Sequence, residues 1–174
     1  LLNSPRITWN ILGRGKYHYN FYLMPFRTTK MSLKKRVNLF SSGLNLIYRN
    51  PRPWSWPIFM QIELTNICNL RCPVCPTGRG EVKRDSEIMD IQMVEKVLSE
   101  VGPYLLAVFF WAWGEPLLHP EFGQAVRIAT DYQINTVIST NGQNLYNKRV
   151  LEQLLGNPPT YLIVAFDGMK DETN

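Results

Sequence analysis

Apolar residues in the second part of the chain fall into four short runs that are typical of strands. Residues 58–64 alternate apolar and polar side chains, which favours a strand with one buried face. Residues 104–113 form a nearly continuous apolar run, as expected of a strand buried on both faces. Residues 135–140 and 161–166 add two further runs of strand length. The pattern therefore predicts four strands after residue 57.

Between these runs, apolar residues recur every three or four positions, which is the spacing of an amphipathic helix. This spacing predicts helices over residues 90–101, 120–132 and 146–155. Strands that alternate with helices favour a parallel sheet with right-handed crossovers. The second and third crossovers are each about twenty residues long, as one helix and two short loops require, whereas the first is about twice as long. The extra length predicts an inserted loop after the first strand.

The inserted loop holds all three cysteines of the chain. Cys68, Cys72 and Cys75 follow the spacing C-x3-C-x2-C. Three thiolates on one short loop suit a soft metal centre, and an odd number of cysteines cannot all form disulfides. A structural zinc site would need a fourth ligand, and neither histidine of the chain lies at zinc-finger spacing. A dithiol redox pair would leave Cys68 without a role, so an iron–sulfur cluster is favoured over both alternatives.

A cluster of polar residues or glycine follows every predicted strand. The cysteine loop follows the first strand, Gly114-Glu115-Pro116 the second, Ser139-Thr140-Asn141-Gly142 the third and Asp167-Gly168 the fourth. The carboxyl ends of parallel strands lie at one edge of a sheet or barrel, where such folds place their sites. We therefore expect the four clusters to share one face. Glu63 belongs either to the interior of this fold or to a solvent-facing edge, and His119 is expected in a turn.

The stretch ELTNICNLRCPVC, residues 63–75, resembles the signature of the radical S-adenosylmethionine (SAM) enzymes. The resemblance implies that Cys68, Cys72 and Cys75 hold a [4Fe-4S] cluster whose fourth iron is chelated by SAM. It also implies a fold: the first four parallel strands of a partial (β/α)6 barrel, truncated within the barrel. The loop is similar to that of members with a C-terminal domain that carries extra clusters and modifies peptides or cofactors.

The resemblance assigns cofactor-binding roles to several other residues. Gly114, Glu115 and Pro116 match a motif whose backbone binds the SAM amino group, with Trp113 where a first glycine often stands. Ser139 and Asn141 match polar contacts to SAM from the third strand. Asp167 matches a contact to a ribose hydroxyl, and Val74 matches an aliphatic contact to adenine. Ala165 replaces a serine that the family often has near the fourth strand, and Val74 replaces an aromatic residue.

The implied activity is reductive cleavage of SAM to a 5′-deoxyadenosyl radical that abstracts hydrogen from a substrate. The implied partners are a flavodoxin- or ferredoxin-like electron donor and a peptide or small-molecule substrate. Two rival classes stay open: a non-catalytic iron–sulfur or zinc protein, and a basic module that docks on a membrane or a nucleic acid.

Charge divides the chain near residue 57. Residues 1–57 carry ten Lys and Arg and no Asp or Glu, whereas residues 58–174 have a net charge of −5. We expect residues 1–57 to be an N-terminal extension with an amphipathic helix over residues 32–48 that begins at Ser32, followed by a proline-rich linker over residues 51–57. The helix is expected to pack on the barrel part, while an anionic surface is the alternative partner of the basic extension.

The composition also bounds the location of the protein. The chain has no run of 18 apolar residues and no signal-peptide pattern, so neither a transmembrane helix nor secretion is predicted. Because the chain begins with Leu1, its natural start is expected to lie further upstream. Three cysteines without disulfide partners fit a reducing compartment, which makes the cytoplasm the expected location.

Overall fold

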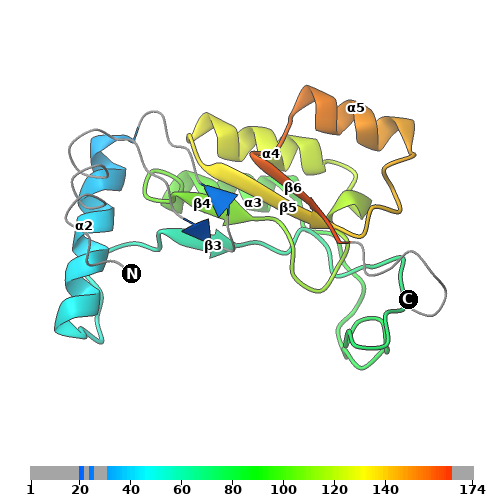
Figure 1. The fold of residues 1–174 in the computed structure, drawn as a ribbon, viewed down its shortest axis with the longest axis horizontal. Helices are drawn as coiled ribbons and strands as arrows, with labels where there is room; N and C mark the ends of the chain where they lie inside the picture. Colours follow the sequence, from blue (N-terminus) through cyan, green and yellow to red (C-terminus); the bar gives the residue numbers. More distant parts are fainter. Residues whose placement is uncertain (1–19, 22–23, 26–30, 166–174) are drawn as a thin grey trace.

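The computed structural model describes residues 20–21, 24–25 and 31–165 of the chain. Four strands form one parallel sheet in the order β3-β4-β5-β6 (Figure 1). They are β3 (Phe59–Gln61), β4 (Ala107–Phe109), β5 (Asn135–Thr140) and β6 (Tyr161–Val164). The α/β fold with four parallel strands in chain order is thereby confirmed.

Three helices connect the strands and cover one face of the sheet. They are α3 (Ile91–Val101), α4 (Phe122–Asp131) and α5 (Lys148–Gly156), and a short 3-10 helix, η1 (Pro116–Leu118), precedes α4. Asp90 and Asn147 cap α3 and α5 by accepting hydrogen bonds from backbone N–H groups in the first turn. Helix α4 begins two residues later than expected: His119 is the C-cap of η1, and Glu121, after Pro120, is the N-cap of α4.

The core lies between this face and the helices. Its fully buried residues come from both the sheet and the helices, including Val108 of β4, Leu98 of α3 and Phe122 of α4. A second, smaller cluster lies on the other face of the sheet, around Phe109 and Val137. Alternate residues of β4 thus point into different clusters, as the period of two along a strand requires.

Strand β4 is much shorter than the apolar pattern predicts. Of residues 104–113 only Ala107–Phe109 form β4, because Tyr104 and Leu105 still belong to turns that end α3. The chain leaves the sheet after Phe110, whose N–H donates to the carbonyl oxygen of Val137. The apolar run is therefore buried throughout its middle, but only part of it is strand.

Helix α2 (Leu33–Tyr48) lies beyond the amino ends of the strands, at the left of Figure 1. Ser32 caps it, as predicted, by accepting a hydrogen bond from the N–H of Lys35. Its contacts with the rest of the chain lie just before β4 and β5, where Asn38 donates to the carbonyl oxygen of Tyr104 and Lys35 to that of Gln133. The expectation that this helix packs on the barrel part agrees with these contacts.

The remaining elements are small. Strands β1 (Asn20–Phe21) and β2 (Met24–Pro25) pair antiparallel in the region where the sequence predicted no fold. Among the residues that the structure describes, no helix combines the length and apolar character needed to cross a bilayer.

Candidate cofactor site

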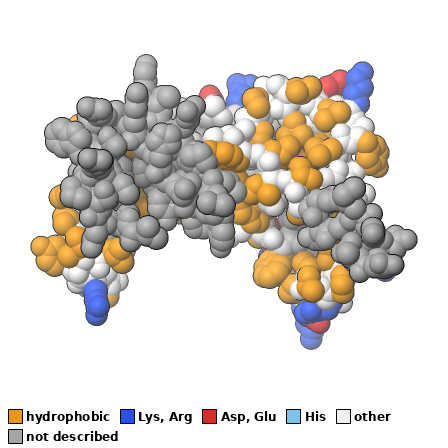
Figure 2. Space-filling view, viewed as in Figure 1, with side chains coloured by type: hydrophobic (Ala, Val, Ile, Leu, Met, Phe, Trp, Pro, Cys, Tyr) orange, Lys and Arg blue, Asp and Glu red, His pale blue; other side chains and the backbone are white. Residues whose placement is uncertain are grey.

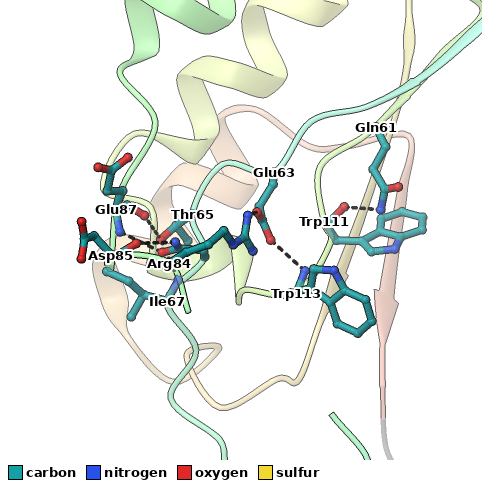
Figure 3. A network of polar contacts seen from close by, with 10 residues as sticks. Gln61, Glu63, Thr65, Ile67, Arg84, Asp85, Glu87, Trp111 and Trp113 are labelled. Atoms are coloured by element: carbon teal, nitrogen blue, oxygen red, sulfur yellow. Dashed lines mark hydrogen bonds and ion pairs between the residues drawn. The ribbon is translucent and has the colours of Figure 1, made fainter. Parts of the chain in front are cut away.

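The cysteine loop is closed at its base by the two chain segments that enter and leave it (Figure 3). The side chain of Asn66 donates to the carbonyl oxygen of Asp85 at 2.6 Å and accepts from the N–H of Glu87 at 2.8 Å. The hydroxyl of Thr65 donates to the carbonyl oxygen of Glu87 at 2.8 Å and accepts from the N–H of Ile67. The loop that carries the cysteines therefore begins and ends at one fixed place, directly after β3.

Within the loop, the chain follows a series of tight turns. The N–H of Cys75 donates to the carbonyl oxygen of Cys72, and that of Arg79 donates to the carbonyl oxygen of Cys75. Gly78 lies so close to Cys72 that a Cβ atom at position 78 would overlap the backbone of that cysteine. All three cysteines are free thiols of intermediate exposure. The turns thus keep the thiols of Cys72 and Cys75 within one compact loop that solvent can reach.

The segment after β4 packs against the entry to the cysteine loop. The N–H of Glu115 donates to the carbonyl oxygen of Ile67 at 2.8 Å, one residue before Cys68. A Cβ atom on Gly114 would overlap the carbonyl group of Thr65, so only glycine permits this approach. The Gly114-Glu115 backbone and the first cysteine are therefore neighbours.

The carboxylate of Glu115 joins the ends of β4 and β5. It is buried and accepts hydrogen bonds from the hydroxyl of Thr140 at 2.6 Å, the N–H of Asn141 at 2.8 Å and the N–H of Leu117 at 3.1 Å. Three donors satisfy its oxygens inside the protein. This side chain holds the two strand ends together, which leaves the backbone of the motif as the part that can face a ligand.

Asn141 links the end of β5 to the cysteine loop. Its side-chain amide donates to the side-chain oxygen of Asn69 at 2.8 Å and lies 3.9 Å from the sulfur of Cys68. Its own side-chain oxygen accepts from the N–H of Gln143. The predicted clusters after the first three strands thus share one face, as the parallel topology requires.

Glu63 and Arg84 add a charged contact beside this face (Figure 3). The carboxylate of Glu63 accepts from the guanidinium of Arg84 at 2.7 Å and from the N–H of Trp113 at 2.9 Å. Burial raises the pKa of Glu63, but Arg84 and the N–H groups of Trp113 and Gly114 outweigh burial and hold that pKa below its ordinary value. The sequence left open whether Glu63 belongs to the interior or to a solvent-facing edge. In the structure, its carboxylate joins the exit of the cysteine loop to the end of β4.

The donor set of three thiols in one loop fits an iron–sulfur cluster by its chemistry. In the part of the chain that the structure describes, no three Cys, His, Asp or Glu side chains lie close enough to hold one ion. The hydroxyl of Thr77, in the same loop, is buried without a hydrogen-bond partner. A buried hydroxyl without a partner, in the same loop as three free thiols, fits a group bound within the loop.

The other residues singled out in the sequence occupy varied places. Val74 is 84% exposed at the tip of the loop, Ser139 is half-buried in β5, and Pro116 is buried at the start of η1. Asp167, predicted to contact a ribose hydroxyl, lies outside the described residues.

His119, expected in a turn, does more than end η1. It is buried, its Nε2 lies 2.7 Å from the carbonyl oxygen of Met89, and its Nδ1 accepts from the N–H of Glu121. These contacts join the chain before α3 to the start of α4, so this histidine is a structural link. No local sequence pattern marks this link or the contacts of Asn66 and Arg84, because each joins residues that are far apart in the chain.

Relatives with known names match the barrel part of the chain. The mycofactocin maturase MftC of Mycobacterium ulcerans is 29% identical over 118 residues, which cover 68% of this chain and 31% of the relative. The 7,8-dihydro-6-hydroxymethylpterin dimethyltransferase of Methanocaldococcus jannaschii is 29% identical over 126 residues, which cover 70% of this chain and 24% of the relative. The chain thus spans about a third or less of the length of these curated relatives.

Solved structures agree with this match. The crystal structure of BtrN in complex with AdoMet and 2-DOIA aligns with a TM-score of 0.53 and 27% identity, over 67% of this chain and 48% of that chain. SuiB of Streptococcus suis bound to S-adenosylmethionine aligns with a TM-score of 0.60 over 80% of this chain and 32% of that chain; at 18% identity it shows the fold alone. A family model described as "Radical SAM superfamily" matches residues 62–174, well over half of the chain. The chain therefore belongs to the radical SAM superfamily, and this membership implies a [4Fe-4S] cluster and SAM as its cofactors.

Proposed function

We propose that the protein is a radical SAM enzyme in which Cys68, Cys72 and Cys75 ligate the [4Fe-4S] cluster. The observation that carries the proposal is the loop of three free thiols, fixed at the carboxyl ends of β3, β4 and β5. When bound, the two cofactors supply an electron that cleaves SAM and a 5′-deoxyadenosyl radical that abstracts hydrogen from a substrate.

The chain's own residues bind and orient these groups. Three thiolates leave one corner of the cluster for SAM, and the backbone carbonyl groups of Gly114-Glu115 would receive the SAM amino group. Glu115 and Thr140 position that backbone, since their hydrogen bond fixes the end of β4 against the end of β5. Asn141, already beside Cys68, offers its amide to the bound cofactor.

Four further residues would contact or support the bound cofactors, in the roles that the family resemblance implies. Pro116 stiffens the Gly114-Glu115 turn, and Ser139 contributes a hydroxyl from β5. The aliphatic side chain of Val74 would lie against adenine, and Asp167 would accept a ribose hydroxyl. The unpartnered hydroxyl of Thr77 would donate a hydrogen bond to the bound cluster.

The organisation and partners of the protein are part of the proposal. Residues 58–174 would be the first part of a radical SAM barrel, and residues 1–57 an extension with its own role; the family match, which begins at residue 62, supports this division. The substrate would be a peptide or a small molecule: SuiB has been crystallised with its precursor peptide SuiA and BtrN with 2-DOIA. A flavodoxin- or ferredoxin-like protein would supply the electron, and the free cysteines favour the cytoplasm.

Anaerobic reconstitution with iron and sulfide tests the ligand assignment. We expect the chain to take up about four irons and four sulfides, and Cys72→Ala to lose most of both. Val74→Ala, between two of the cysteines, is the matched control and should retain the cluster. A chain that instead purifies with one tetrahedral zinc and no acid-labile sulfide would overturn the proposal. Formation of 5′-deoxyadenosine after adding dithionite and SAM tests the activity separately.

A further inference from the structure

Helix α2 turns its apolar stripe away from the sheet and the helices that the structure describes. Five apolar or aromatic residues on one side of the helix are between 54% and 75% exposed: Leu33, Val37, Phe40, Ile47 and Tyr48. A helix that packs on a domain normally buries such a stripe in the core. Here the orientation is reversed, so within the described part of the chain the stripe stays exposed.

Specific hydrogen bonds from the opposite side of α2 fix this orientation. Lys35, which is 2% exposed, donates from its Nζ to the carbonyl oxygens of Tyr132 and Gln133, each at 2.8 Å. The side chain of Asn38 accepts from the N–H of Trp56 at 2.8 Å and donates to the carbonyl oxygen of that residue. Rotating the helix to bury its apolar stripe would break these contacts and leave buried polar groups without partners.

The segment after α2 places aromatic rings and positive charges beside the stripe. Asn45 holds this segment by accepting from the N–H of Trp54 and donating to the hydroxyl of Ser55. The ring of Trp54 is 67% exposed, with its centroid 6.4 Å from that of Tyr48. The exposed Arg49 and Arg52 lie next to these aromatic residues in the chain, and Lys34 is exposed at the other end of α2. Figure 2 shows apolar side chains and a basic tip gathered at the lower end of α2, where grey atoms do not cover it.

We propose that the outer face of α2 and the adjoining tryptophan segment form a docking surface for an anionic lipid bilayer. Interfacial helices combine three kinds of residue. Apolar residues enter the acyl boundary, Trp and Tyr lie at the headgroup level, and Lys and Arg attract anionic lipid headgroups. Residues 1–57 contain no acidic side chain to oppose that attraction.

Other occupants match this surface less well. A second copy would bring the exposed Lys34, Arg49 and Arg52 against the same positive charges, and residues 1–57 offer no acidic side chain to pair with them, so the two faces would repel. A nucleic acid would use the positive charges but has no use for an exposed stripe of Leu, Val and Ile. The docking surface also lies at the end of the sheet opposite the cysteine loop (Figure 1), so a membrane bound there leaves the cofactor site open.

Sedimentation with lipid vesicles tests the proposal. We expect the full chain to sediment with vesicles of equal parts phosphatidylglycerol and phosphatidylcholine, and to bind vesicles of phosphatidylcholine alone much less. The double variant Val37→Ser/Phe40→Ser should weaken binding at least about tenfold. Each of Lys34→Gln, Arg49→Gln and Arg52→Gln should weaken it about fivefold at low salt. Leu155→Ser removes an equally exposed apolar side chain from α5 and should leave binding unchanged.

Three results would overturn the proposal. One is the absence of sedimentation with anionic vesicles while circular dichroism shows a folded chain. Another is equal binding by the wild type and the Val37→Ser/Phe40→Ser variant. The third is tighter binding to a DNA or RNA oligonucleotide, or a dimer that the double variant abolishes, in place of lipid binding.

Discussion

Gly114 shows how one missing side chain brings two strand ends together. Its backbone lies against the carbonyl group of Thr65, and the next residue donates its N–H to Ile67. We expect Gly114→Ala to lower the free energy of unfolding by about 1–3 kcal/mol or more, because the added methyl group overlaps backbone that cannot yield without breaking this contact. Urea unfolding followed by circular dichroism measures the effect.

Gly43, in the middle of α2, provides the opposite case. A Cβ atom there meets nothing within 4 Å, and its φ angle is not in the left-handed region. Gly43→Ala should therefore raise the free energy of unfolding by about 0.5–1 kcal/mol through helix propensity. Equal effects of the two glycine substitutions would contradict the close approach seen at position 114.

Thr77 gives a second prediction for a single residue. Its buried hydroxyl has no partner among the described residues, so removing it costs the cofactor-free chain no hydrogen bond. Thr77→Val should leave that chain equally stable or more stable by up to about 1–2 kcal/mol in urea unfolding. After anaerobic reconstitution, the same variant should lose its cluster faster in air than Thr77→Ser, which keeps the hydroxyl. A destabilised cofactor-free Thr77→Val chain would show that the hydroxyl has a partner within the protein.

At the scale of elements, the docking of α2 depends on one buried amine. Burial lowers the pKa of Lys35 from its ordinary 10.5 to about 8. The unfolded chain keeps this proton up to higher pH, so the free energy of unfolding should rise between about pH 8 and pH 10.5. The two carbonyl acceptors at the end of α4 oppose the shift by favouring the charged amine, so we expect a gain of roughly 1–2 kcal/mol.

The comparison of two neighbouring lysines isolates this effect. Lys35→Gln should remove the rise, while Lys34→Gln, next to it but exposed, should keep it. Urea unfolding of both variants at pH 7 and pH 10 measures the difference, and the cysteine and tyrosine contributions cancel between them. If the wild-type free energy of unfolding instead falls relative to that of Lys35→Gln between pH 7 and pH 10, the pKa of Lys35 is not lowered by burial.

The elements also show what sequence patterns can predict. Apolar spacing and cap residues located α2, α3 and all four parallel strands, because burial of apolar side chains determines these elements. The same spacing does not indicate which side of α2 packs on the rest of the described chain, since hydrogen bonds from Lys35 and Asn38 decide its orientation. The base of the cysteine loop was not predicted either. Thr65 and Asn66 reach partners about twenty residues away, and no local pattern marks such pairs.

At the scale of the whole molecule, the sheet separates two surfaces with different chemistry. The thiols, Gly114 and Asn141 lie at the carboxyl ends of the strands, whereas α2 lies beyond their amino ends (Figure 1). The core between them is continuous and rigidly packed, including Leu98, Val108 and Ile138, none of which is exposed. Nothing in the contacts of either surface requires the other to be occupied.

This separation predicts that changes at the two surfaces act independently. Val37→Ser/Phe40→Ser should retain the iron and sulfide content of the wild type after reconstitution, and Cys72→Ala should keep its affinity for anionic vesicles. The combined variant should show the sum of the separate effects on stability, within about 0.5 kcal/mol, because no shared side chain couples the two surfaces. Iron content, vesicle sedimentation and urea unfolding on the same preparations give the three readouts. A cluster content that falls with the α2 substitutions would mean that the sheet transmits changes between its ends, in which case lipid binding would also regulate the cofactor site.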